Sequence, residues 1–231
     1  MSIKEYYHRL GNTSLNISLY FIVIGMLLNV YLLMKNQVIY GGILFIAVSF
    51  LYYSIHLYYV KKSQKVQLQL TKEDDTRILN RYILESNHGC LYYFSPNGIA
   101  NVKVKLKYTI KGVRFSILEK DNELGYVIYR NKQLQFYLLE KLFFGTVSSN
   151  GKHEIGNISI ENSEIHLKKS KNNEFKFMKD NQIIAEVKKG WLPISWTKIF
   201  RLNTPVLLFQ DKVTTEEKLA ILLILPVVYN V

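Results

Sequence analysis

The stretch TTEEKLAILLILPVVY, residues 214–229, decides the fold of this chain. Thr214, with Glu217 three residues later, fits a capping box, and acidic side chains suit the positive end of a helix. From Leu219 onward the segment is apolar on every side, whereas a surface helix is apolar along one stripe only. The apolar part is about 11 residues long and too short to cross a bilayer. We therefore expect a helix at about 214–230 that is enclosed on every side; a re-entrant or membrane-surface segment is the alternative.

The region before this helix alternates apolar and polar residues with the period of a β-strand. In 102–107 aliphatic residues alternate with Lys103, Lys105 and Lys107, which indicates one buried and one wet face. Similar segments lie at 66–70, 112–118, 125–129, 133–139, 155–160, 164–168, 174–178 and 183–188. Segment 76–84 fits either a strand or a helical turn. Many short strands between turn signals predict a sandwich or barrel. Strands that need a core and a helix that needs enclosure together predict a mainly antiparallel β-barrel with the helix through its middle.

The end of the chain resembles the tubby C-terminal-like superfamily, which includes tubby proteins, phospholipid scramblases and LURP-one-related proteins. NQIIAEVKKGW at 181–191 resembles a late strand and turn of that group, and LLFQD at 207–211 with the apolar run to Tyr229 resembles its ending. The resemblance covers about 66–231 in pattern and is concentrated near the C-terminus. It implies a barrel around the C-terminal helix and, because tubby proteins bind phosphoinositides, recognition of anionic lipid headgroups. An N-terminal hairpin departs from the usual layout, in which a scramblase-type membrane helix is C-terminal.

Two long apolar runs precede the barrel. They are LNISLYFIVIGMLLNVYLLM at 15–34 and VIYGGILFIAVSFLYYSIHLYYV at 38–60, and neither contains Asp, Glu, Lys or Arg. Roughly 20 residues suffice to cross a hydrocarbon core of about 30 Å. The gap at 35–37 permits only a tight turn, so 15–60 is predicted to be a transmembrane helical hairpin. A cleaved signal peptide for the first run, or two core helices of a soluble protein, are the alternatives.

Flanking charges predict the orientation of this hairpin. Lys4 and Arg9 precede the first run, and Lys61, Lys62 and Lys65 follow the second, whereas only Lys35 lies in the turn. The positive-inside rule therefore places the N-terminal segment 1–14 and the barrel domain 61–231 in the cytoplasm of a multi-pass cell-membrane protein.

Composition favours a lipid surface as partner. The formal net charge is +12, and a basic domain held at a bilayer faces an anionic leaflet. No helix-turn-helix, zinc-finger or RNA-binding motif is present, so no nucleic-acid partner is expected. The single cysteine, Cys90, suits a reducing compartment.

No sequence motif indicates catalysis, a metal or a cofactor. The five histidines are scattered, and HExxH, CxxC, GxxxxGK[ST] and GxGxxG are all absent. His88 and Cys90 would share one face of a strand as a nucleophile and base, although a buried structural cysteine is the commoner arrangement. We therefore predict a non-enzymatic protein without cofactor or metal.

The predicted binding residues are basic and aromatic. Lys188, Lys189, Trp191, Trp196 and Lys198 are the lipid-binding candidates, because rings sit at headgroup depth while ammonium groups meet phosphate. Alternatively, the tryptophans cover the barrel end and the lysines keep the surface soluble. The predicted function is a membrane-anchored module that recognises anionic lipid headgroups. The alternative is a bacterial membrane adaptor, stress or immunity protein that binds another protein through the barrel.

Overall fold

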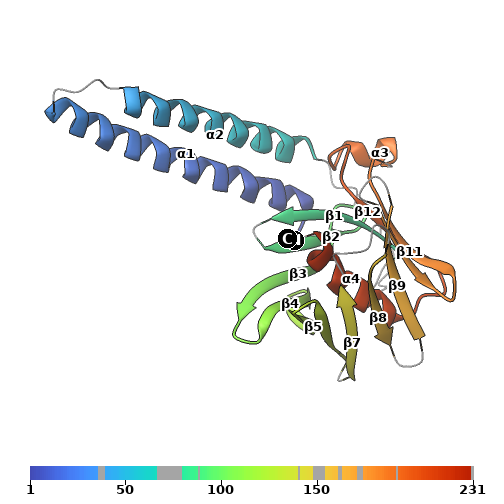
Figure 1. Ribbon diagram of the computed structural model, residues 1–231. Helices are drawn as coiled ribbons and strands as arrows, with labels where there is room; N and C mark the ends of the chain where they lie inside the picture. Colours follow the sequence, from blue (N-terminus) through green and yellow to red (C-terminus); the bar gives the residue numbers. More distant parts are fainter. Residues whose placement is uncertain are drawn as a thin grey trace. The chain divides into compact units, whose positions relative to one another are not determined.

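The chain forms two compact units, Met1–Leu68 and Gln69–Val231 (Figure 1). The computed structural model describes residues 1–35, 40–66, 80–87, 89–139, 141–147, 154–160, 163–170, 174–190 and 192–229. The predicted segment at 66–70, apart from Val66, and the first part of 76–84 lie outside the described residues.

The N-terminal unit is a pair of long helices, α1 (Ile3–Met34) and α2 (Tyr40–Lys65). Helix α1 begins well before the apolar run, because Ser2 and Glu5 form a capping box. The Glu5 N–H donates to Ser2 Oγ over 3.2 Å, and the Ser2 N–H donates to Glu5 Oε2 over 2.9 Å. Both helices are long and apolar enough to cross a membrane. The predicted helical hairpin is therefore present.

Small and polar residues form the seam between α1 and α2. Ser18 Oγ donates to the Ser49 carbonyl over 3.0 Å, and Ser49 Oγ donates back to the Ser18 carbonyl over 2.9 Å. Closer to the N-terminus of α1 and the C-terminus of α2, His56 Nδ1 lies 2.9 Å from the Gly11 carbonyl oxygen. At Gly25 an added Cβ would lie only 3.2 Å from the Gly42 carbonyl oxygen, so the two helix backbones approach each other closely there.

The outer faces of both helices are apolar and uncovered. Large apolar side chains remain exposed along α1 and α2; they include Leu19, Val23, Leu27, Val30, Ile43, Leu44, Phe50, Leu51 and Leu57. Core helices of a soluble domain bury such side chains, so this exposure argues against that alternative.

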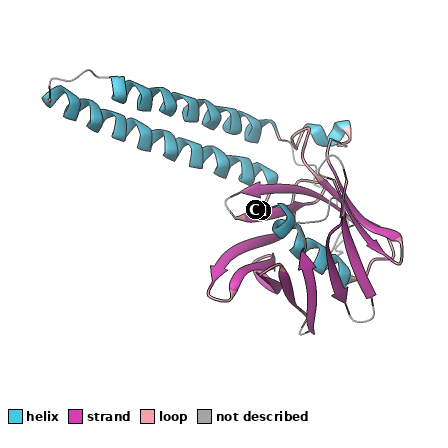
Figure 2. Cartoon of the chain, in the orientation of Figure 1, coloured by secondary structure: helices cyan, strands magenta, loops and turns pink. Residues whose placement is uncertain are grey.

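The second unit is a closed barrel of antiparallel strands (Figure 2). The strands are β1 (Arg81–Asn87), β2 (Cys90–Phe94), β3 (Ala100–Thr109), β4 (Gly112–Glu119), β5 (Asn122–Arg130), β6 (Gln133–Leu138), β7 (Lys141–Val147), β8 (Glu154–Ile160), β9 (Ser163–Lys169), β10 (Phe175–Lys179), β11 (Gln182–Lys188) and β12 (Val206–Phe209). From β1 to β11, each strand pairs with the strand that follows it in the chain. Strand β12 closes the barrel between β1 and β11. A short helix, α3 (Ile194–Thr197), lies in the connection before β12.

Hairpin turns fix the register of these strands. The two-residue turns Lys120–Asp121, Asn131–Lys132 and Asp180–Asn181 all have positive φ at both residues. Such turns match the right-handed twist of the flanking strands, and Asn and Asp tolerate the left-handed conformation better than most residues do.

Helix α4 (Thr215–Tyr229) runs through the barrel, as predicted (Figure 1, red). Every residue from Leu219 to Leu225 is buried, and together they form one core with inward side chains such as Val104, Ile117, Val127 and Phe136. Each enclosed Leu or Ile stabilises the fold by roughly 1.5–3 kcal/mol. The alternative of a membrane-surface segment is therefore wrong.

A tyrosine repairs the backbone defect that a proline creates in α4. Pro226 has no N–H, so the Leu222 carbonyl four residues earlier lacks its helical donor. The buried Tyr93 hydroxyl donates to that carbonyl from β2. Burial raises the pKa of Tyr93 well above its ordinary value, with smaller contributions from Tyr229 and Tyr82, so the hydroxyl stays protonated.

The barrel has an α4 N-terminal end and an α4 C-terminal end, defined by the two ends of the helix that it encloses. Strand β10 illustrates them: the Phe175 ring lies 5.2 Å from the ring of Tyr229, the last residue of α4, whereas Lys179 pairs with Glu217 in the first turn. Because neighbouring strands are antiparallel, the β4–β5 and β10–β11 turns lie at the α4 N-terminal end. The β1–β2, β3–β4 and β5–β6 turns and the 189–205 connection lie at the α4 C-terminal end.

Candidate ligand-binding site

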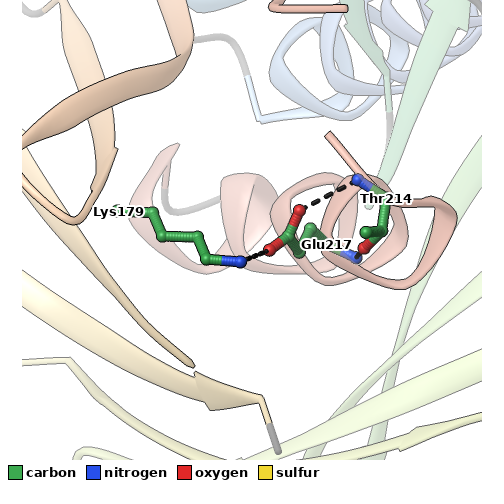
Figure 3. A network of polar contacts seen from close by, with 3 residues as sticks. All are labelled: Lys179, Thr214 and Glu217. Atoms are coloured by element: carbon green, nitrogen blue, oxygen red, sulfur yellow. Dashed lines mark hydrogen bonds and ion pairs between the residues drawn. The ribbon is translucent and has the colours of Figure 1, made fainter. Parts of the chain in front are cut away.

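A polar network of Lys179, Thr214 and Glu217 lies at the α4 N-terminal end (Figure 3). The Glu217 N–H donates to Thr214 Oγ1 over 3.3 Å, and the Thr214 N–H donates to Glu217 Oε2 over 2.9 Å. This confirms the predicted capping box. The other carboxylate oxygen of Glu217, whose residue is only 3% exposed, accepts from Lys179 Nζ over 2.7 Å.

The electrostatics of this network favour the charged pair. Burial alone would raise the pKa of Glu217, but the hydrogen bonds from Lys179 and Thr214 outweigh it and hold that pKa below its ordinary value. The hydrogen bond to Glu217 in turn raises the pKa of Lys179. A carboxylate at the first turn also complements the helix dipole. The charges of Lys179 and Glu217 are paired with each other, so neither is available to a ligand.

Three other lysines near this end also have polar partners. Lys141 Nζ lies 2.9 Å from Glu216 Oε1, and Lys103 lies 2.5 Å from Asp121. Lys218 Nζ donates to Asn80 Oδ1 over 2.7 Å. The paired lysines of the α4 N-terminal end thus have structural roles, while Lys120 and Lys212 are exposed there.

Basic residues dominate the α4 C-terminal end. They are Lys105, Lys107, Lys111, Arg130, Lys132, Lys168, Lys169, Lys188, Lys189, Lys198 and Arg201. Acidic residues near this end are fewer: Glu85, Glu154, Glu174 and Glu186. This imbalance makes the end attractive to anions.

A groove of about 480 Å³ opens on the outer wall at this end. It is lined by Ile128 and by six polar residues: Lys111, Arg130, Asn131, Gln133, Gln135 and Tyr137. The pairing of β5 with β6 sets Arg130 opposite Gln133 and Ile128 opposite Gln135. Their chain neighbours Val127, Leu134 and Phe136 point inward and are buried, so strand alternation places the groove residues outside.

Stacked side chains form a wall beside the groove. The Arg114 guanidinium lies 3.8 Å over the Tyr126 ring, and the Tyr126 and Tyr137 rings stack with centroids 4.6 Å apart. Arg114 also pairs with Glu123. This ladder across β4, β5 and β6 holds Tyr137 in place at the groove edge.

The two cations of the groove are available. Within the described part of the chain, the side chains of Lys111 and Arg130 make no ion pair or hydrogen bond, and no acidic residue lines the groove. Arg130 can present a planar fork to a phosphate or carboxylate, and Lys111 a mobile point charge. The amides of Asn131, Gln133 and Gln135 can both donate and accept. The groove therefore offers positive charge together with hydrogen-bond donors and acceptors.

Four of the sequence-predicted site residues are described, and Lys188, Lys189, Trp196 and Lys198 all lie at the α4 C-terminal end, but the structure does not group them into one site. Lys188 Nζ pairs with Glu186 at 2.6 Å, so part of its charge is neutralised. Lys189 and Trp196 are half-buried, and Lys198 is exposed just after α3. Trp191 lies outside the described residues.

A second hollow, of about 310 Å³, has mixed charge. Its lining includes Glu85, which is 7% exposed and accepts from Thr204 Oγ1 over 3.2 Å, and also Arg201. The buried Tyr229 hydroxyl has no hydrogen-bond partner among the described atoms, and burial raises the pKa of Tyr229, which keeps it a donor. With a carboxylate and a guanidinium together, this hollow suits an anion less well than the groove does.

Among the described residues no three His, Cys, Asp or Glu side chains gather as a metal site. Cys90 is half-buried on β2, and His88 lies outside the described residues. The pairing of His88 as base with Cys90 as nucleophile is therefore not tested by the structure. The chain matches no protein-family model, no curated protein and no solved structure. The geometry defines a β-barrel with a basic groove on its outer wall, and function is argued from that groove.

Proposed function

We propose that this protein is a non-enzymatic, membrane-anchored module that binds the anionic headgroup of a lipid in the Lys111–Arg130 groove. The observation that carries the proposal is the combination of two cations without partners in the described chain, three amides and no acidic lining. A volume of about 480 Å³ falls in the usual range of small-ligand sites, roughly 300–1,000 Å³. An anionic cytoplasmic leaflet would supply such headgroups.

In this proposal α1 and α2 span the membrane as a hairpin, with both termini cytoplasmic. The apolar outer faces of the helices and the reciprocal Ser18–Ser49 hydrogen bonds support a packed hairpin rather than a cleaved leader. The basic residues Lys4, Arg9, Lys61 and Lys62 at the helix ends opposite the turn support the orientation.

The barrel is proposed to be a tubby-like domain. The closed barrel around an apolar C-terminal helix agrees with the ending that 181–191 and 207–229 resemble. Headgroup recognition is then consistent with the resemblance, but through Lys111 and Arg130 rather than mainly through Lys188, Lys189, Trp196 and Lys198.

Titration calorimetry on the full chain in detergent tests headgroup binding. Short-chain phosphatidylinositol bisphosphate should bind, short-chain phosphatidylcholine should not, and added salt should weaken the binding. Lys111→Gln with Arg130→Gln should weaken it at least tenfold. Lys120→Gln with Lys212→Gln removes two exposed charges at the other end and should leave affinity within about twofold, since those residues lie outside the groove. Equal losses in both double variants would reduce the effect to net charge and contradict the proposal.

The single cysteine tests the topology. A membrane-impermeant maleimide should label Cys90 in lysed cells but not in intact cells, because the barrel is proposed to be cytoplasmic. Labelling in intact cells would place the barrel outside and remove the anionic leaflet as its ligand source.

One observation favours the adaptor alternative. Leu139, Leu142 and Phe144 leave an exposed apolar surface beside β7, of the kind that contacts proteins. If no anionic headgroup binds, a protein partner on this surface becomes the better candidate.

A further inference from the structure

The hairpin of β3 and β4 ends in a projecting apolar tip (Figure 1, green). The tip reads KYTIKG, residues 107–112. Ile110 is fully exposed and Tyr108 is 78% exposed, while Lys107 and Lys111 flank them and are exposed too. A soluble barrel gains nothing from a bare isoleucine at a turn, where polar and glycine residues are the usual choice.

The backbone holds this tip in its projecting shape. Thr109 pairs with Gly112, and Thr109 Oγ1 donates to the Gly112 carbonyl over 2.7 Å. Gly112 has φ 134°, and a Cβ there would lie 2.5 Å from the Tyr129 carbonyl oxygen of β5. The base of the tip therefore packs closely against β5, and Ile110 is exposed beyond it.

The tip and the groove share a residue. Lys111 follows Ile110 and also lines the groove with Arg130. An apolar point between lysines matches the layered chemistry of a bilayer surface, where acyl chains lie beneath anionic phosphates. A surface that received Ile110 would place its headgroups at the level of Lys111.

We infer that Tyr108 and Ile110 insert into the interface of an anionic leaflet, where Lys107 and Lys111 meet its phosphates. The tip then sets the depth at which the groove meets a headgroup. This inference rests on the proposed headgroup function for its purpose, but the insertion itself is measured separately. Charge complementarity selects the bilayer as occupant: Lys105, Lys107 and Lys111 surround the tip, and no acidic residue lies in 100–118.

Site-specific fluorescence on the full chain tests the insertion. In a Cys90→Ser background, an environment-sensitive NBD label is attached at Ile110→Cys, or at Lys120→Cys as a matched turn position at the other end. The protein is reconstituted in nanodiscs of phosphatidylcholine with or without phosphatidylserine. In anionic discs the label at 110 should brighten at least twofold, shift to the blue and be quenched by nitroxide-bearing lipids. The label at 120 should do none of these.

Two outcomes would overturn the insertion. One is an unchanged label at 110; the other is a blue shift without lipid quenching, which would place the tip against protein.

A second variant separates the two proposals. Tyr108→Ser with Ile110→Ser should leave calorimetric binding of the soluble short-chain headgroup within about twofold, since both residues lie outside the groove. Insertion at 110 without headgroup binding by the wild type would remove the proposed function and keep the tip. Headgroup binding without insertion would do the reverse.

Discussion

The two ends of the barrel carry charge in opposite ways. At the α4 N-terminal end Lys179, Lys141 and Lys103 each form an ion pair with an acidic side chain, and Glu217 is buried in its own capping network. At the α4 C-terminal end Lys111 and Arg130 line a groove without any acidic residue. Paired charges stabilise a fold, whereas charges held without partners are available to a ligand. We therefore propose that one end contributes stability and that the other binds the ligand.

The middle of α4 belongs to neither end, and it should show the largest effect. Leu223→Asp places a charge where the side chain is fully buried among apolar residues. An isolated buried charge costs several kcal/mol, comparable with the whole stability of a domain. We expect the barrel to lose its cooperative thermal transition and its protease resistance. Thr215→Asp, at the exposed first residue of α4, is the control and should leave both intact. A folded Leu223→Asp barrel would refute the enclosed helix.

The Tyr93–Leu222 hydrogen bond should give the next largest effect. Tyr93→Phe strands the Leu222 carbonyl, and a buried unsatisfied polar group costs about 1–3 kcal/mol. Chemical denaturation measures this loss. In a Pro226→Ala background residue 226 regains its N–H, so the added cost of Tyr93→Phe should fall by about half or more. An equal cost in both backgrounds would mean that the tyrosine acts through packing alone.

Glu217→Gln should lower stability at neutral pH by about 1 kcal/mol, since glutamine keeps the cap but loses the ion pair with Lys179. For a domain of this size that is a fall in Tm of about 2–4 °C.

The pH dependence of this difference follows from the two pKa directions. The pKa of Glu217 is lowered in the fold, so its contribution is present above its ordinary value and is lost as pH falls through the folded value. The pKa of Lys179 is raised, so its contribution persists until pH rises through that raised value. The gap between wild type and Glu217→Gln should therefore be widest near neutrality and close in acid. A gap that persists in strong acid would rule out the ion pair as its cause.

Lys141→Gln should have the smallest effect of the series. Its partner Glu216 lies at 2.9 Å, but the Lys141 side chain is about half exposed. Exposed ion pairs contribute roughly 0–1 kcal/mol and are screened by salt. Thermal unfolding should fall by no more than about 2 °C, and added salt should erase the difference. A larger effect would make the rim of the N-terminal end more important than its buried Glu217.

The elements that could be predicted from the sequence are those whose burial is reflected in the local order of apolar and polar residues. The alternation in 102–107 predicted β3, and the apolar residues on every side of α4 predicted an enclosed helix. Strands β1, β2 and β7 were not assigned from alternation: Tyr82, Ile83, Leu84 and Glu85 of β1 are all buried, so its two faces look alike.

The groove was not visible from sequence because it is a product of register. Lys111 reaches it from the β3–β4 turn, Arg130 from β5 and Gln135 from β6. No local pattern unites them. The Lys188 candidate did carry a signal against it: Glu186 is two residues away and therefore shares its face of β11, where the two pair.

Thermal unfolding with and without a saturating short-chain phosphatidylinositol bisphosphate tests the separation of the two ends most directly. The variants are Lys111→Gln with Arg130→Gln, and Glu217→Gln. We expect the first to keep the wild-type Tm without ligand and to lose the ligand-induced increase, and the second to have a lower Tm and a wild-type increase. An undiminished ligand-induced increase in the Lys111→Gln and Arg130→Gln variant would contradict the assignment of binding to the basic groove.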